Sequence, residues 1–165
     1  MEIKTIVVGD LQTNCYILEK NNEVLIIDPG AEAKKIIKEV GAKKVVGCLL
    51  THSHFDHVGA LEEICTYYNV KENEYKGSNF SYEVIETKGH TADSVTYYFK
   101  KEKIMFCGDF IFYHSIGRTD LGGSDSDMLE SLKKISLYDD DIVLYPGHGP
   151  KTTLEEEKRR FRFYY

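Results

Sequence analysis

Residues 51–57, Thr-His-Ser-His-Phe-Asp-His, hold three of the six histidines of the chain, with an aspartate among them. This segment follows directly on the apolar run 44–50, which is typical of a buried strand. A buried strand that ends in ligand-type side chains delivers them to one edge of its sheet. The pattern therefore predicts a fold in which a sheet edge carries a metal site.

The side chains of this segment are those that bind metal ions. Neutral imidazole and carboxylate suit zinc, iron and manganese. Alternate side chains of an extended segment point the same way, so we expect His52, His54 and Asp56 to share one face. His57 then turns toward the site from the start of a helix over 58–68. The alternative is a polar loop with surface histidines, which three histidines and an aspartate directly after a strand make the weaker interpretation.

The four side chains of this cluster are too few to complete two metal sites, because each zinc ion usually takes about four ligands. Three later segments each end a strand-like stretch with a glycine beside a histidine or aspartate. They are Gly89-His90-Thr91, Cys107-Gly108-Asp109 and Pro146-Gly147-His148-Gly149. Each alone fits a turn histidine or a strand-terminating aspartate. Together with the first cluster they predict a shared set of ligands.

Bulk properties narrow the class of protein. The 165 residues suffice for one domain with a core, and the net charge of −6 disfavours a nucleic-acid partner. No long apolar segment or signal peptide is visible, which predicts a cytoplasmic protein without a membrane span. Cys15, Cys48, Cys65 and Cys107 lack the spacing of a structural zinc site, and we expect reduced thiols.

Periodicity predicts alternating strands and helices. The expected strands are 3–8, 14–19, 23–28, 45–50, 80–87, 94–100, 103–107 and 142–145. The expected helices are 31–40, 58–68, 125–135 and 153–161. Residues 110–123 show no period and are expected to form an ordered loop at the active site. These periods alone indicate only a mixed α and β protein.

The chain resembles the metallo-β-lactamase superfamily, and within it the short prokaryotic relatives of glyoxalase II (hydroxyacylglutathione hydrolase). The resembling motifs are Thr13-Asn14-Cys15-Tyr16, Ile27-Asp28-Pro29-Gly30, the 51–59 cluster, Gly89-His90-Thr91, Gly108-Asp109, 115–120 and 145–149. The resemblance implies an α+β fold, a four-layer αββα sandwich with two mixed β-sheets face to face and helices outside. It also implies a single domain over 1–165, without the helical C-terminal domain that helps full-length glyoxalase II to bind glutathione.

The resemblance further implies two divalent metal ions, zinc first, with iron or manganese as alternatives. The implied ligands are His52, His54 and His90 for the first ion, Asp56, His57 and His148 for the second, and Asp109 for both. Asp56 and Asp109 are the expected catalytic carboxylates, because Asp109 bridges the ions and Asp56 can also orient the attacking hydroxide.

Four other residues are expected to support the ligands or line the pocket. Asp28 is either a support for the ligands or a simple turn residue at a strand end. Arg118 either recognises a substrate carboxylate or pairs with Asp120 to hold its loop. Tyr145 and Lys151 lie beside the last ligand in the sequence and are expected in the pocket.

The implied reaction is hydrolysis of a small acyl thioester or ester by a hydroxide that bridges the two metals. The alternatives are a persulfide dioxygenase-like oxidoreductase with a single iron, or a hydrolase of lactones or other esters. A protein that stores or binds metal without chemistry is a third class. Residues 89–94 read Gly-His-Thr-Ala-Asp-Ser where the family often has Gly-His-Thr-Pro-Gly-Ser, a difference that changes the turn after the ligand and not the ligand itself. The sequence leaves the thiol carrier and the oligomeric state open.

Overall fold

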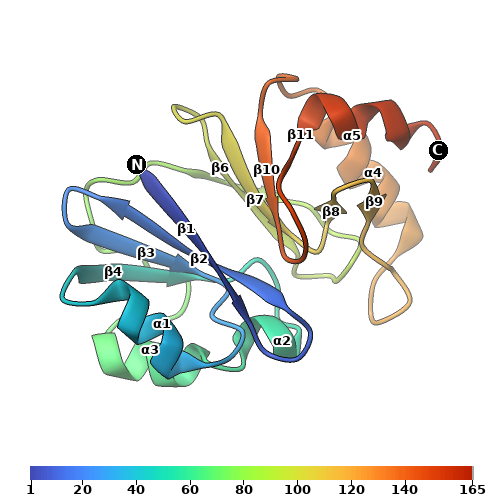
Figure 1. The fold of residues 1–165 in the computed structure, drawn as a ribbon. Helices are drawn as coiled ribbons and strands as arrows, with labels where there is room; N and C mark the ends of the chain where they lie inside the picture. The colour runs from blue at the N-terminus through green and yellow to red at the C-terminus, as the bar shows by residue number, and fades with distance from the viewer. Residues whose placement is uncertain (165) are drawn as a thin grey trace. The chain divides into compact units, whose positions relative to one another are not determined.

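The computed structural model describes residues 1–164 of the chain. They form two compact units, Met1–Ser81 and a second unit that begins at Tyr82. Each unit has its own β-sheet with helices beside it (Figure 1). In each unit the candidate metal ligands follow the ends of strands.

The first sheet has the strand order β1-β2-β3-β4. Its strands are β1 (Glu2–Val8), β2 (Thr13–Lys20), β3 (Glu23–Ile27) and β4 (Lys44–Leu49). The β1–β2 and β2–β3 pairs are antiparallel, and β3 and β4 are parallel. A parallel pair needs a crossover connection, which α1 (Ala33–Val40) supplies.

One face of this sheet is covered by α1 and by α3 (Leu61–Tyr68), as Figure 1 shows. The buried cluster between them joins apolar side chains of the strands to Ile36 of α1 and Ile64 of α3, both fully buried. The amphipathic spacing of the two helices places these side chains on the inner face. The parallel β3–β4 pair is thus fixed by its core, and both strands end at the same sheet edge.

The predicted helix over 58–68 is wrong at its start, because the structure has two shorter helices there. The first, α2, is Phe55–Val58, and α3 begins only at Leu61. Between them the Ala60 N–H donates to the carbonyl of Pro29 at 3.0 Å. A Cβ on Gly59 would stand 2.4 Å from the carbonyl oxygen of Gly30. The close approach of the turn after β3 thus breaks the helix.

The second unit has a five-stranded sheet of order β11-β10-β7-β6-β5, in which only β10 and β7 are parallel. Its strands are β5 (Glu83–Glu86), β6 (Val95–Phe99), β7 (Ile104–Gly108), β10 (Val143–Pro146) and β11 (Thr152–Thr153). The helices α4 (Asp125–Ile135) and α5 (Leu154–Phe161) pack on it through buried side chains such as Leu132 and Phe161.

Helix α4 lies where the sequence predicts it, and the Ser124 side chain caps it by accepting the Asp127 N–H at 3.2 Å. The 110–123 segment differs from its prediction, because it contains a hairpin of β8 (Ile111–Phe112) and β9 (Ser115–Ile116). Two-residue strands are too short to show an alternating pattern, so periodicity misses them.

We expect Ile26→Ala to lower the free energy of unfolding by about 2–5 kcal/mol, because it opens a cavity in the first sheet. Ile26 is fully buried in β3. The matched variant Val7→Ala shortens an apolar side chain of β1 that is 47% exposed and should change stability by less than about 0.5 kcal/mol. Urea titration checks both, and equal losses would contradict this packing.

Candidate metal centre

The first unit brings four predicted ligands together. The rings of His54 and His57 lie 4.9 Å and 4.2 Å from the ring of His52, between centroids. Nε2 of His57 lies 3.4 Å from Oδ2 of Asp56. The backbone is extended only as far as His54, which precedes α2 with φ −60° and ψ 144°. The prediction that extended alternation places Asp56 is therefore wrong in its cause, since Asp56 lies on a helix.

Asp28 binds two parts of this cluster at once. Its side chain is 1% exposed, accepts the Thr51 N–H at 2.8 Å and the Thr51 hydroxyl at 2.6 Å, and lies 2.9 Å from Nδ1 of His57. A carboxylate only accepts, so Nδ1 of His57 carries the proton. The lone pair of that ring is then on Nε2, the atom that can bind a metal.

The same bond sets the ring of His52. Oγ1 of Thr51 lies 3.1 Å from Nδ1 of His52, and its single proton is donated to Asp28. The hydroxyl must therefore accept from Nδ1, which leaves the lone pair of His52 on Nε2. Asp28 orients His57 directly and His52 through Thr51, as expected for support of the ligands.

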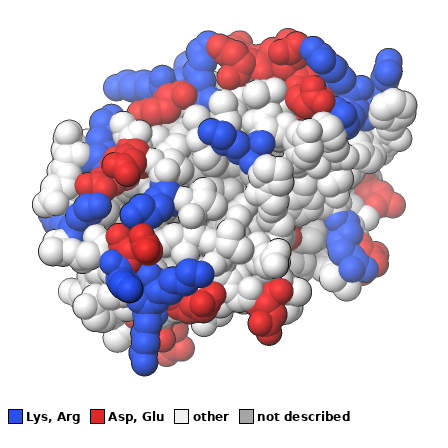
Figure 2. Space-filling view, in the orientation of Figure 1, with Lys and Arg blue, Asp and Glu red and all other residues white. Residues whose placement is uncertain are grey.

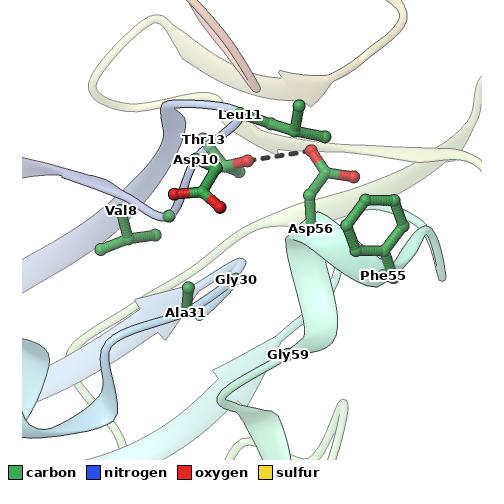
Figure 3. A pocket seen from close by; sticks show the side chains of 10 residues that line it. Val8, Asp10, Leu11, Thr13, Gly30, Ala31, Phe55, Asp56 and Gly59 are labelled. Atoms are coloured by element: carbon green, nitrogen blue, oxygen red, sulfur yellow. Dashed lines mark hydrogen bonds between the residues drawn. The ribbon is translucent and has the colours of Figure 1, made fainter.

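Asp56 is oriented by Thr13, which belongs to one of the resembling motifs but received no role from the sequence. The buried Thr13 hydroxyl donates to Oδ2 of Asp56 at 2.9 Å, drawn as a dashed line in Figure 3. Thr13 lies at the start of β2, 43 positions from Asp56, and no spacing rule links the two.

A pocket of about 290 Å³ opens beside this bond. It lies between the β1–β2 turn and α2 and is lined by Val8, Gly9, Asp10, Leu11, Thr13, Gly30, Ala31, Phe55, Asp56 and Gly59 (Figure 3). Phe55 and Leu11 remain 75% and 53% exposed at its rim. Asp56 therefore borders a space large enough for part of a small molecule.

The second unit brings the other three predicted ligands together. Oδ2 of Asp109 lies 3.5 Å from Nε2 of His90 and 3.4 Å from Nε2 of His148. His90 Nδ1 lies 2.7 Å from the carbonyl oxygen of Arg118. A carbonyl only accepts, so the proton is on Nδ1 and the lone pair of His90 is again on Nε2.

The loop that carries this carbonyl packs closely on the site. A Cβ on Gly117 would stand 1.8 Å from the carbonyl oxygen of Asp109 and 3.2 Å from Nδ1 of His90. Only glycine allows the backbone to approach this near. The 110–123 segment, which contains the β8–β9 hairpin, thus packs directly on His90 and Asp109.

These spacings fit shared metal ions. Two ligand atoms each about 2.1 Å from a tetrahedral ion lie about 3.4 Å apart, whereas an N–H···O hydrogen bond is about 2.7–3.2 Å long. The three nitrogen–oxygen distances at Asp56–His57, His90–Asp109 and His148–Asp109 are 3.4, 3.5 and 3.4 Å. The imidazole and carboxylate donors suit zinc, iron or manganese.

Cys107, close to Asp109 in sequence, is not part of this donor set. Burial raises the pKa of its thiol to about 12, and the thiol donates to the carbonyl of Ile111 at 3.3 Å. The same sulfur lies 3.6 Å from the carbonyl oxygen of Tyr145, so both printed contacts of this thiol are with backbone carbonyls.

The other predicted residues of the second unit, Arg118, Tyr145 and Lys151, make contacts of their own. Arg118 pairs with Asp120 through two bonds of 2.6 Å, and this pairing lowers the pKa of the Asp120 carboxyl to about 2. Of the two roles expected for Arg118, the structure shows the pairing. Lys151 Nζ lies 5.8 Å from the centroid of the Tyr145 ring, and that ring stacks on Phe106 at 5.0 Å.

Comparison with known proteins now decides the family. The profile of the metallo-beta-lactamase superfamily matches residues 8–75 and 70–148. The chain belongs to this superfamily. Two similar curated proteins are "Probable metallo-hydrolase YqgX" of Bacillus subtilis (strain 168), 34% identical, and "Hydroxyacylglutathione hydrolase GloC" of Haemophilus influenzae, 31% identical. The first match covers 96% of this chain and 95% of the relative, and the second covers 96% of each.

Solved structures agree with this membership. The crystal structure of "BLEG-1 B3 metallo-beta-lactamase" is 29% identical, with a TM-score of 0.89 over 99% of each chain. That of "TTHA1623 in a di-iron-bound form" is 28% identical, with a TM-score of 0.85 over 94% of this chain and 97% of the other. The predicted metallo-β-lactamase fold, α+β with two mixed sheets, is confirmed.

The superfamily member described here is a metallohydrolase with His/Asp metal-binding groups, and its fold implies divalent metal ions. Within residues 1–164, no helix has the length and apolar character needed to cross a membrane.

We expect Asp28→Asn to weaken metal binding by about 10–100-fold, because an amide has one acceptor oxygen where the carboxylate uses two to bind Thr51 and His57. Competition against a chromophoric chelator measures this affinity. Asp141→Asn is the matched control, since Asp141 is an exposed carboxylate that pairs with Lys103. Unchanged affinity in Asp28→Asn would show that this carboxylate does not set the ring.

Proposed function

We propose that this protein is a binuclear metallohydrolase of small acyl thioesters. The ligands in this proposal are His52, His54 and His90 for one ion, Asp56, His57 and His148 for the other, and Asp109 for both. The observation that carries it is the position of Asp109, whose Oδ2 lies 3.4–3.5 Å from the ring nitrogens of both His90 and His148. One carboxylate oxygen at ligand–ligand spacing from two histidines assigned to different ions is what a bridging aspartate requires.

Residues around the proposed ligands hold the ligand side chains in fixed orientations. Asp28 and Thr51 fix two rings of the first unit, and the Arg118 carbonyl fixes His90. The Thr13 hydroxyl holds Oδ2 of Asp56, so that carboxylate keeps one orientation toward an attacking hydroxide. Bound there, two divalent ions supply a hydroxide near neutral pH and positive charge that stabilises the oxyanion of acyl transfer.

Zinc is the proposed metal, with iron as the first alternative. His/Asp donor sets accept zinc, iron or manganese according to supply. A similar solved protein is titled as a di-iron-bound form, which supports testing iron beside zinc.

A thioester is the proposed substrate because a thiolate leaves readily and needs little protonation. The relative titled hydroxyacylglutathione hydrolase GloC, similar over nearly the whole chain, supports this choice. Lactones and other esters remain the second class, and a single-iron persulfide dioxygenase remains the rival outside hydrolysis. A β-lactam belongs in the assay panel because of the similar protein titled a metallo-β-lactamase.

A small-molecule substrate in the cytoplasm remains our expectation, without a nucleic-acid or membrane partner. Acidic and basic side chains are mixed on the face shown in Figure 2, and that face has no extended basic surface. The net charge of −6 likewise opposes binding to a phosphate backbone.

The deciding experiment is elemental analysis of the purified protein, followed by assays with thioester, lactone, β-lactam and persulfide substrates. About two metal ions per chain with thioester hydrolysis supports the proposal. About one iron per chain with oxygen consumption on a persulfide would overturn it.

We expect His54→Ala and Asp109→Ala each to lose bound metal and to lower thioester hydrolysis by more than about 100-fold, beyond the loss from a supporting residue. Metal content and initial rates are measured together. Asp140→Ala, which removes an exposed partner of Lys158, is the control and should retain both. Full turnover by metal-free Asp109→Ala protein would contradict a metal-dependent mechanism of hydrolysis.

A further inference from the structure

An apolar hollow of about 430 Å³ lies in the second unit beside the ligand His148. Its walls are Phe112, Tyr113, His148, Gly149 and Pro150. None of these five residues is an aspartate, glutamate, lysine or arginine. The Phe112 ring lies 6.1 Å from the His148 ring, between centroids. The hollow therefore reaches a residue that the proposed function places on a metal ion.

The aromatic wall stands on the tip of the β8–β9 hairpin. Tyr113 is 49% exposed, and its ring stacks on that of His114 at 3.7 Å. His114 has a φ of 64°, in the left-handed region that non-glycine residues rarely adopt. A hairpin of two-residue strands with such a tip needs support from elsewhere in the unit.

That support comes from α5. The Glu157 side chain is 2% exposed, and its two carboxylate oxygens accept the His114 backbone N–H at 3.2 and 3.1 Å. Glu157 also accepts the Thr152 hydroxyl at 2.7 Å. The His114 side chain is held by the neighbouring residue of α5, because its Nε2 lies 3.0 Å from a carboxylate oxygen of Glu156. A buried carboxylate is costly unless it is well bonded, and here its bonds hold the tip.

We propose that this hollow is a substrate subsite for an uncharged alkyl or aryl group carried next to the reacting bond. The proposal rests on the proposed function, because His148 links the hollow to the reacting centre only as a metal ligand. Tyr113 and Phe112 contact the group, and Glu157 is a positioning residue that acts through the hairpin tip. A carboxylate in the hollow loses hydration and meets no lysine or arginine in its walls, so charged groups are disfavoured. Its size lies within the range of small-molecule pockets and admits a phenyl ring.

The apolar group can belong to the acyl side or to the thiol side of the substrate. Two series of thioesters separate these sources. One series varies the acyl group, acetyl against phenylacetyl, on a fixed small thiol. The other keeps the acetyl group and changes the thiol from a small alkyl thiol to benzyl mercaptan. The series in which kcat/KM rises with the apolar group identifies which side occupies the hollow.

Tyr113→Ala tests the contact itself. We expect the ratio of kcat/KM for the aryl substrate over its small counterpart to fall about tenfold, as for lost apolar contacts in a specificity pocket. Phe163→Ala is the matched control, because Phe163 is an aromatic side chain of the same unit that is 72% exposed. That variant should keep the ratio of the wild type. Tyr113→Glu, which places a charge in the wall, should lower the ratio at least as much and is the second variant if Tyr113→Ala is unstable.

Glu157 is tested by coupling. We expect Glu157→Gln and Glu157→Ala to lower the same ratio, with the glutamine variant retaining more of it because its amide oxygen can still accept the His114 N–H. The Glu157→Ala/Tyr113→Ala double variant should lose no more than Tyr113→Ala alone, since both act on one wall. Additive losses in the ratio would overturn the positioning role.

A binding measurement separates this proposal from the proposed function. Saturation-transfer NMR with the neutral probe phenylacetamide, and acetamide as its counterpart, needs no turnover. If no thioester is hydrolysed but phenylacetamide binds the wild type and not Tyr113→Ala, the thioesterase proposal fails and the subsite stands. If thioesters are hydrolysed while Tyr113→Ala changes neither the substrate ratio nor the binding of phenylacetamide, the subsite is overturned.

Discussion

The arrangement of the candidate ligands in the first unit depends on one buried carboxylate, Asp28. Its three hydrogen bonds join the end of β3 to the end of β4 and to α2, and its φ of 53° lets the chain turn immediately into Pro29. Because the carboxylate can only accept, a single side chain decides which nitrogen of His57 and, through Thr51, of His52 bears the lone pair. The fold thus sets the protonation pattern of the ligands as well as their positions.

In the second unit a backbone group, and not a side chain, fixes which ring nitrogen of a ligand histidine carries the proton. Here the acceptor-only group is the carbonyl of Arg118, which takes the Nδ1 proton of His90. The carbonyl can reach that nitrogen because Gly117 lies against the backbone of Asp109. The Arg118 side chain meanwhile is held by Asp120, so the residue serves the site through its main chain. Both units therefore present Nε2 by removing the alternative tautomer, although they use different chemistry to do so.

The sequence predicts the parts of this design that leave a local pattern. Apolar runs that end in glycine and a ligand locate the strand ends, and Ser124 with Asp127 locates α4, whose cap the structure confirms. Prediction from the sequence fails where a contact with a segment far away in the chain changes the local structure. The helix predicted after His57 breaks because the chain around Pro29 approaches it. The role of Thr13, which the sequence shows only as part of a motif, is missed because its bond to Asp56 spans 43 positions and leaves no period.

In the second unit, Arg118 and Glu157 make structural contacts, and this limits how they can recognise a substrate. Arg118 is bound bidentately by Asp120, and the carboxylate of Glu157 is buried under the hairpin tip. A guanidinium already matched by a carboxylate fork offers little to a second carboxylate without breaking the first pair. The wall beside His148, whose hairpin tip Glu157 holds, has no lysine, arginine or acidic residue. Selectivity near this ligand then depends on shape and apolar contact, which discriminate between related compounds more weakly than hydrogen-bonded or charged contacts do.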